Sequence, residues 1–252
     1  MEINQKLFTD IALEAAKAAG QEILKIYNSA DLGVEFKADD SPLTKADLAA
    51  HQIISDFLSE TNLPILSEEG KSIGYSERKN WEYFWMVDPL DGTKEFVKRN
   101  GEFTVNIALI HKGAPVIGVV YAPVLDWLFW GNSEGAWKVE GANPVVVDLQ
   151  KKTGEPIQTI VASRSHLSSE TQEIIDQYPQ ADVVSMGSSL KFMLLAEGKA
   201  QLYPRFAPTM EWDTAAAHGV LKALGYEIKK IDIDEPLSYN KENLLNPWFI
   251  AS

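Results

Sequence analysis

The sequence predicts a mixed fold, in which an α+β half is followed by an α/β half. Three observations support this. Apolar and alanine residues recur at helical spacing from about residue 7 to residue 28. Four strand-like segments separated by turn residues follow one another between residues 103 and 139, which indicates an antiparallel meander. Between residues 159 and 231, strand-like and helix-like segments alternate, as they do in α/β layers.

The first half is predicted to begin with two packing helices. The first carries an apolar stripe that includes Leu7 and Ile23. The second is expected from about residue 44 to residue 60, where Thr44 and Asp47 form a capping-box pattern at its start. Leu48 is expected on its buried face. A short strand is predicted near residues 34–36, between the two helices.

The remaining elements follow from turn residues and periodicity. Residues 71–80 are polar and lack periodicity, so they are interpreted as a solvent loop, with a flap over the site as the alternative. The polar stretch at residues 150–156 suits a boundary between domains 1–153 and 154–252. Strands are predicted at residues 103–110, 116–121, 127–130, 136–139, 144–149, 159–162, 181–185, 201–203 and 227–231, and further helices at 168–178, 189–197 and 212–224.

Composition excludes several classes of function. The 252 residues, 45% of them apolar, can bury a large core. A formal charge of -13 and a pI near 4.8 argue against a nucleic-acid polymer as partner. The chain has no cysteine, so thiolate metal sites and disulfides are excluded. No signal core or membrane-spanning segment is found. We expect a cytoplasmic monomer or homodimer, with any association at the inner face of the cell membrane peripheral.

The most informative stretch follows a predicted buried strand at residues 83–87. Asp88 and Asp91 come directly after it, and Pro89 is expected to end strand pairing because it lacks a backbone donor. Gly92 allows a tight turn, and Thr93 is expected to cap the next helix, whose first amides suit a phosphate. Carboxylates beside a phosphate site repel the substrate unless cations lie between them. The stretch therefore predicts a site for magnesium-type ions.

Each acidic candidate also has a purely structural explanation. Asp-Pro and Asp-Gly pairs are common turn formers, and Glu68 and Glu69 before a glycine are typical of a solvated loop. Asp213, in the first turn of the last predicted helix, is favoured there by the helix dipole alone. The four histidines show no zinc-binding spacing, so His218 is interpreted as a packing residue.

Four motifs in order resemble the lithium-sensitive, magnesium-dependent phosphatases of the inositol monophosphatase family, which include fructose-1,6-bisphosphatase and 3'(2'),5'-bisphosphate nucleotidases. The resemblance covers essentially the whole chain. It implies a layered αβαβα sandwich of the inositol monophosphatase and sugar phosphatase type. The motifs are Ser-Pro-x-Thr-x-Ala-Asp at residues 41–47, Glu-Glu at 68–69, Asp-Pro-Leu-Asp-Gly-Thr at 88–93 and Trp-Asp-x-Ala-Ala at 212–216.

The resemblance also implies a role for each motif. Two or three Mg2+ ions are expected, with Mn2+ as a substitute, because every ligand is an oxygen. Asp47 and Thr93 would orient the attacking water, and the amides of Gly92 and Thr93 would hold the phosphoryl group. The implied metal ligands are Glu68, Asp88 and the Leu90 carbonyl for one ion and Asp88, Asp91 and Asp213 for another, with Glu69 acting through water.

The expected substrate depends on three clusters that follow strands of the second half. A single Arg or Lys is usually a surface charge, and Ser188 and Ser189 are explained equally well as a helix cap. Together, however, the clusters resemble the segments by which 3'(2'),5'-bisphosphate nucleotidases, including the bacterial enzymes of sulfate assimilation, hold an adenosine phosphate. The residues expected around the substrate are Arg164, His166, Ser188, Ser189, Lys191 and Arg205, with Asp213 and the Gly92 and Thr93 amides.

The resemblance thus implies hydrolysis of the 3'-phosphate of 3'-phosphoadenosine 5'-phosphate, giving AMP and phosphate. The 5'-phosphosulfate analogue is a second candidate substrate. An inositol monophosphatase or sugar bisphosphatase with the same metal site is the alternative enzyme. A non-catalytic sensor of phosphonucleotides is the alternative outside catalysis. Such a sensor would be expected to lose a metal carboxylate or the Asp47 and Thr93 pair, and all of these residues are present.

Overall fold

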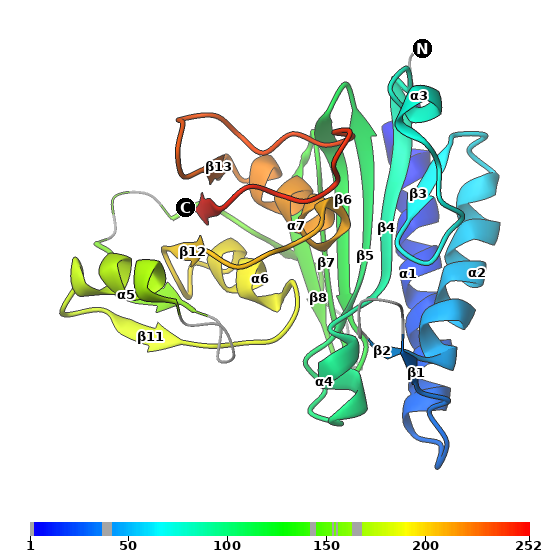
Figure 1. The fold of residues 1–252 in the computed structure, drawn as a ribbon, viewed down its shortest axis with the longest axis horizontal. Helices are drawn as coiled ribbons and strands as arrows, with labels where there is room; N and C mark the ends of the chain where they lie inside the picture. Colours follow the sequence, from blue (N-terminus) through cyan, green and yellow to red (C-terminus); the bar gives the residue numbers. More distant parts are fainter. Residues whose placement is uncertain (1–2, 37–41, 142–144, 153, 155, 163–167) are drawn as a thin grey trace.

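The computed structural model describes residues 3–36, 42–141, 145–152, 154, 156–162 and 168–252. Helices and sheets alternate in layers across the molecule (Figure 1). Helices α1 (Gln5–Tyr27) and α2 (Lys45–Ser59) cover one face of a large sheet, and α6 (Leu190–Ala196) and α7 (Glu211–Ala223) lie between it and the smaller strands. Helix α5 (Ser169–Asp176) lies on the outer side. The predicted αβαβα sandwich is confirmed.

The large sheet is the meander expected from the first half. Its strands follow the order β3-β4-β5-β6-β7-β8-β9, and all neighbours are antiparallel except β3 and β4, which are parallel. The short strands β1 (Glu35–Phe36) and β2 (Pro42–Leu43) pair separately. The bounds are β3 Ile65–Ser67, β4 Tyr83–Asp91, β5 Thr104–His111, β6 Ala114–Ala122, β7 Trp127–Asn132, β8 Gly135–Glu140 and β9 Val147–Asp148.

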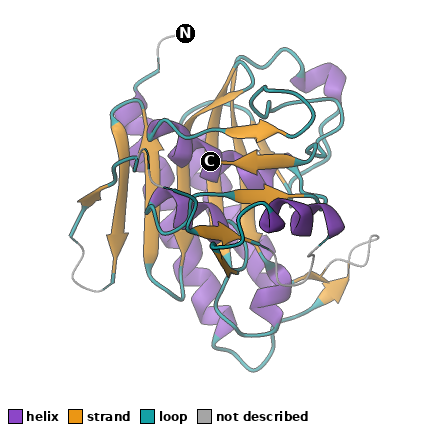
Figure 2. Ribbon diagram, turned by 90° about the vertical axis from the view of Figure 1, so that its left-hand side faces the viewer, coloured by secondary structure: helices purple, strands orange, loops and turns teal. Residues whose placement is uncertain are grey.

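The second half supplies the smaller strands, which run across the direction of the large sheet (Figure 2). Strands β10 (Thr159–Val161) and β11 (Asp182–Val184) are parallel, as an α/β layer requires. Strand β14 (Phe249–Ala251) was not predicted. It lies between β12 (Tyr203–Arg205) and β13 (Ile228–Lys230) and is antiparallel to both, so this layer is mixed.

The two halves share a hydrophobic core. One buried cluster joins Phe84 and Met86 of β4 to Phe192 of α6 and Val220 of α7. Helix α7 approaches the sheet closely because β6 carries Gly118 there, where a Cβ atom would collide with the backbone of α7. The proposed boundary between residues 153 and 154 stays a prediction.

Two details differ from the expectations. Leu7 and Leu48 were placed on buried stripes but are 49% and 50% exposed, because the alanine-rich faces of α1 and α2 are the buried ones. Residues 71–80 are more than a solvent loop, since they contain helix α3 (Tyr75–Arg78), whose Arg78 is buried.

Among the residues described, no helix combines the length and apolar composition needed to cross a membrane.

Candidate active site at the junction of the two halves

The turn after β4 brings two carboxylates to the end of the strand. Asp88 is paired with Asn106 of β5 and Asp91 with Thr104, and the register shifts between these pairs. The expectation that Pro89 ends the pairing is therefore wrong. The irregularity accommodates a residue without an N–H group, and pairing resumes beyond it.

The following turn places Thr93 differently from the prediction. Gly92 is the N-cap of α4 (Thr93–Val97) and has φ +91°, a left-handed conformation that favours glycine. Thr93 is therefore the first helical residue, not the cap. Its hydroxyl group lies 3.2 Å from Oδ1 of Asp47 and 3.2 Å from the carbonyl oxygen of Leu90. The predicted pairing of Thr93 with Asp47 is present.

Asp47 makes both sets of contacts that the sequence suggested, with Thr44 and with Thr93. Its Oδ2 accepts hydrogen bonds from the backbone N–H (2.7 Å) and the hydroxyl (2.5 Å) of Thr44, which completes the capping box of α2. Its Oδ1 faces Thr93. Burial raises the pKa of Asp47, although the bonds from Thr44 and Thr93 oppose the shift. The carboxylate is therefore held rigidly and is more basic than an exposed one.

Three carboxylates from the two halves meet at one point. One oxygen atom each from Asp88, Asp91 and Asp213 lies within 4.8 Å of the others. Burial raises the pKa of Asp88 well above its usual value, and the neighbouring charges of Glu68, Asp91 and Asp213 add to this effect. The pKa of Asp213 is raised for the same two reasons, burial first and Asp91 next. A cation would relieve this repulsion, so the donor set fits hard metal ions.

The structure also shows which elements position Glu68, Glu69 and Asp213 near this cluster. Parallel pairing aligns Ser67 of β3 with Val87 of β4, and the backbone N–H of Glu68 continues the ladder by donating to the Val87 carbonyl (3.1 Å). Glu68 is thereby set beside Asp88, while Glu69 follows on a half-buried turn. Asp213 is fixed in the first turn of α7, where its Oδ2 accepts the backbone N–H of Met210 (2.8 Å).

Asp91 is oriented by side chains from both halves. Its Oδ2 accepts hydrogen bonds from the hydroxyl groups of Ser188 (2.6 Å) and Ser189 (3.1 Å) and lies 3.4 Å from the Asn106 amide nitrogen. The Ser189 hydroxyl also lies 2.9 Å from the Asp213 carbonyl oxygen. All three contacts to Asp91 use the same oxygen, which fixes the direction of the other.

Sequence reasoning missed two residues of this network. Thr104 and Asn106 on β5 are buried, and the Thr104 hydroxyl lies 2.5 Å from that of Ser188. The Asn106 amide donates to Ser189 (2.9 Å). A signal was available, because two polar residues two positions apart in an apolar strand lie on the same face of the sheet.

A cavity of about 320 Å³ connects the acid cluster with the predicted substrate residues. This volume suits a small ligand. Lys94, Lys98, Tyr203 and Phe249 also contribute to its wall. The predicted site residues that line it are Asp91, Gly92, Ser188, Lys191, Arg205 and Asp213. Ser189 is not among the lining residues.

Two of the basic residues predicted to bind the substrate, Lys191 and Arg205, line this cavity. The ammonium group of Lys191 is held by the carbonyl oxygens of Met186 (3.1 Å) and Ser188 (2.7 Å), and burial lowers its pKa to about 8. Arg205 is half-buried, with Nη2 3.4 Å from the Pro208 carbonyl oxygen. The other basic residues predicted for the substrate, Arg164 and His166, lie outside the described residues.

His218 is a packing residue, as predicted. It is buried in α7, where Nδ1 lies 2.8 Å from the Tyr239 hydroxyl and Nε2 contacts Glu227. Burial lowers the pKa of His218, although Glu227 opposes the shift. Both ring nitrogens of His218 therefore contact residues of the second half, Tyr239 and Glu227.

The layered sandwich and the acid cluster shared by both halves define the class of protein. The model of the inositol monophosphatase family matches residues 4–247, and the chain belongs to this family. It is 47% identical to the 3'(2'),5'-bisphosphate nucleotidase CysQ of Escherichia coli K12 over 247 residues, covering 96% of this chain and 98% of that protein. The Haemophilus influenzae CysQ is 35% identical, with 98% and 93% covered. The crystal structure of Bacteroides thetaiotaomicron CysQ matches with a TM-score of 0.87 and 47% identity, covering 97% of this chain and 96% of the other.

Proposed function

We propose that this protein is a 3'(2'),5'-bisphosphate nucleotidase, which converts 3'-phosphoadenosine 5'-phosphate and water to AMP and phosphate. The observation that carries the proposal is one cavity lined both by Asp91 and Asp213 of the acid cluster and by the cations Lys191 and Arg205. A doubly phosphorylated nucleotide needs both kinds of group. The near full-length similarity to CysQ proteins supports the same assignment.

The proposal includes Mg2+ as cofactor, two or three ions, with Mn2+ as substitute. When bound, the ions supply positive charge and Lewis acidity to the reacting phosphoryl group. An all-oxygen donor set without cysteine or a histidine cluster fits these hard cations. The residues assigned to hold them are Glu68, Asp88, the Leu90 carbonyl, Asp91 and Asp213, with Glu69 acting through water.

Asp47 and Thr93 are assigned to the attacking water. The Thr93 hydroxyl, oriented by Oδ1 of Asp47, accepts a hydrogen bond from the water and can pass its own proton to that carboxylate. The raised pKa of Asp47 makes it a better proton acceptor than an exposed aspartate. The water oxygen forms a bond to phosphorus as the bond between phosphorus and the ribose 3'-oxygen breaks, and the released oxygen gains a proton.

Lys191 and Arg205 are assigned to the nucleotide, because their charges lie in the same cavity as the acid cluster. Ser188 is assigned to substrate contact and to Asp91, whose carboxylate it already holds. Arg164, His166 and Ser189 are also assigned to contact with the substrate. The 5'-phosphosulfate analogue is proposed as a second substrate. The amides of Gly92 and Thr93 are assigned to the phosphoryl oxygens.

Phosphate release from three substrates tests the proposal. With Mg2+ present, kcat/KM should be highest for 3'-phosphoadenosine 5'-phosphate and lower for inositol 1-phosphate and fructose 1,6-bisphosphate, and added lithium should inhibit. A preference for inositol 1-phosphate or the sugar bisphosphate would favour the alternative enzyme, an inositol monophosphatase or sugar bisphosphatase. Binding of the nucleotide without any turnover would indicate a sensor.

A further inference from the structure

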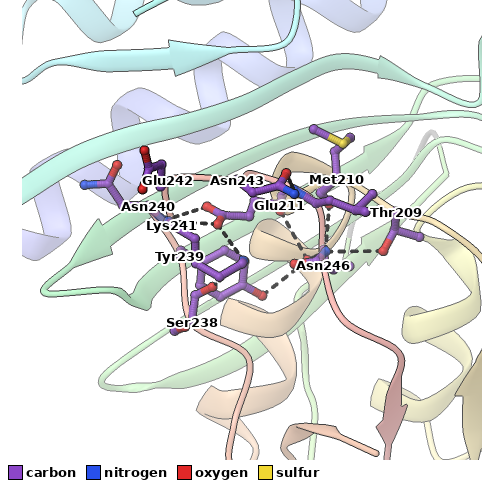
Figure 3. Close-up of polar contacts among 12 residues, drawn as sticks. Thr209, Met210, Glu211, Ser238, Tyr239, Asn240, Lys241, Glu242, Asn243 and Asn246 are labelled. Carbon is purple, nitrogen blue, oxygen red and sulfur yellow. Dashed lines mark hydrogen bonds and ion pairs between the residues drawn. The ribbon is translucent and has the colours of Figure 1, made fainter. Parts of the chain in front are cut away.

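A buried carboxylate next to the acid cluster holds a segment from the end of the chain. Glu211, the first residue of α7, is 0% exposed and lies two positions before Asp213. It accepts hydrogen bonds from the backbone N–H groups of Asn240 (2.5 Å) and Lys241 (3.0 Å) and from the Lys241 ammonium group (2.6 Å) (Figure 3). We call residues 238–246 the strap.

The strap also forms hydrogen bonds with the other side of the first turn of α7. The side-chain amide of Asn246 donates to the carbonyl oxygen of Met210 (2.8 Å) (Figure 3). It also donates to the hydroxyl of Thr214 (3.0 Å). The backbone N–H of Glu211 donates in return to the carbonyl of Leu244 (2.9 Å). The helix start that carries Asp213 is therefore bonded to the strap at both ends.

The same strap is fastened to the first half by Arg78. This side chain is only 3% exposed. Its guanidinium group donates to Oδ1 of Asn240 (2.9 Å) and to the carbonyls of Lys241 (2.6 Å) and Glu242 (2.8 Å), and the Asn240 amide donates back to the Arg78 carbonyl (2.7 Å). A planar guanidinium group can satisfy several acceptors in one geometry, which a lysine cannot.

Arg78 lies in the connection between β3 and β4. This connection begins at Glu68 and leads into β4, the strand that carries Asp88. Arg78, the strap and Glu211 thus form a polar bridge between the two halves. At one end is the connection that joins Glu68 to the strand of Asp88, and at the other is α7, which carries Asp213.

We propose that this bridge sets the position of Asp213 opposite Glu68 and Asp88, and that Arg78 and Glu211 are positioning residues for the metal site. The proposal rests on the function proposed above. The acids repel one another when no cation is bound, and Asp213 belongs to the other half of the chain. Small residues set the distance of α7 from the sheet, whereas the bridge anchors its first turn. Without that anchor, Asp213 can move away from the cluster.

The test measures metal binding directly, without substrate. Mn2+ binding is followed by the electron paramagnetic resonance signal of the free ion in the wild type, Glu211→Gln and Arg78→Lys, with the melting temperature recorded for each. Lys138→Met is the control, because Lys138 is also buried and charge-paired but binds Glu140 and Glu197 instead. We expect Mn2+ affinity to fall about tenfold in both bridge variants, the lower end for residues that support metal ligands, and to stay unchanged in the control.

Other outcomes would overturn the proposal. Wild-type Mn2+ affinity in both bridge variants, with only lower melting temperatures, would show that the bridge merely stabilises the fold. An equal loss in Lys138→Met would attribute the effect to general destabilisation. Failure of the wild type itself to bind Mn2+ would refute the proposed metal dependence, which is a distinguishable result. Arg78→Lys keeps the charge, so it provides a milder variant if Glu211→Gln does not fold.

Discussion

The hydroxyl group of Thr93 lies 3.2 Å from Oδ1 of Asp47, although the two residues are 46 positions apart in the chain. Each stands at the start of a helix, Asp47 in the first turn of α2 and Thr93 as the first residue of α4. The capping box of α2 holds the carboxylate still by its other oxygen. A structural cap therefore also orients a group that can accept a proton.

Removing the Thr93 hydroxyl should impair chemistry without unfolding the protein. We expect Thr93→Val to lower kcat by about 10²- to 10⁴-fold, the range typical of positioned proton-transfer groups. Thr93→Ser should retain most of the activity. Steady-state kinetics and circular dichroism measure the two effects, and near-normal turnover in Thr93→Val would refute the role assigned to the pair.

Ser189 should matter through Asp91. Ser189→Ala removes one hydrogen bond to the carboxylate (3.1 Å), so the Mg2+ concentration for half-maximal activity should rise about 10- to 100-fold. Asp91→Asn should abolish turnover. Ser185→Ala is the matched control, because the buried Ser185 hydroxyl has no hydrogen-bond partner among the described residues. A metal requirement equal to that of the control would contradict the prediction.

The pKa of Lys191, lowered by burial to about 8, predicts a pH dependence. Lys191 carries its charge below this pH and loses it as the pH rises. The kcat/KM for the bisphosphate nucleotide should therefore decrease above pH 8, by up to about tenfold per pH unit. Lys191→Arg should remove this limb, because arginine stays protonated. An unchanged limb in that variant would assign the titration to another group.

Lys138 should stabilise the junction of the two halves. Its ammonium group is buried, 2.7 Å from Glu197 at the end of α6 and 4.3 Å from the centre of the Trp127 ring. Lys138→Met leaves Glu197 with Lys199 as its remaining charged partner, so the free energy of unfolding should fall by about 1–3 kcal/mol. Urea denaturation measures this. The double variant with Glu197→Gln should recover part of the loss, and additive losses would show that the pair is not coupled.

Local sequence determined much of this protein. The capping box at Thr44 and Asp47, the buried strand that runs into Asp88 and the helix that carries Asp213 each depend on residues close in the chain. Their propensities and caps act within one or two turns. For this reason the order of nearly all helices and strands could be predicted before any tertiary contact was known. The local stretch also indicated Asp88 and Asp91 as candidate ligands, whereas Glu68 and Asp213 were named from the family resemblance.

Tertiary structure decided what depends on contacts between distant segments. Strand β14 has three residues and forms only because β12 and β13 lie on either side of it. The pairing of β4 resumes beyond Pro89 because β5 offers Thr104 opposite Asp91. Nothing in the polar sequence around Arg78 distinguishes it from a surface residue. Its burial depends on its hydrogen bonds to Asn240 and Lys241 of the strap. Such contacts join residues that no local pattern relates, since burial and pairing partners are properties of the packed chain.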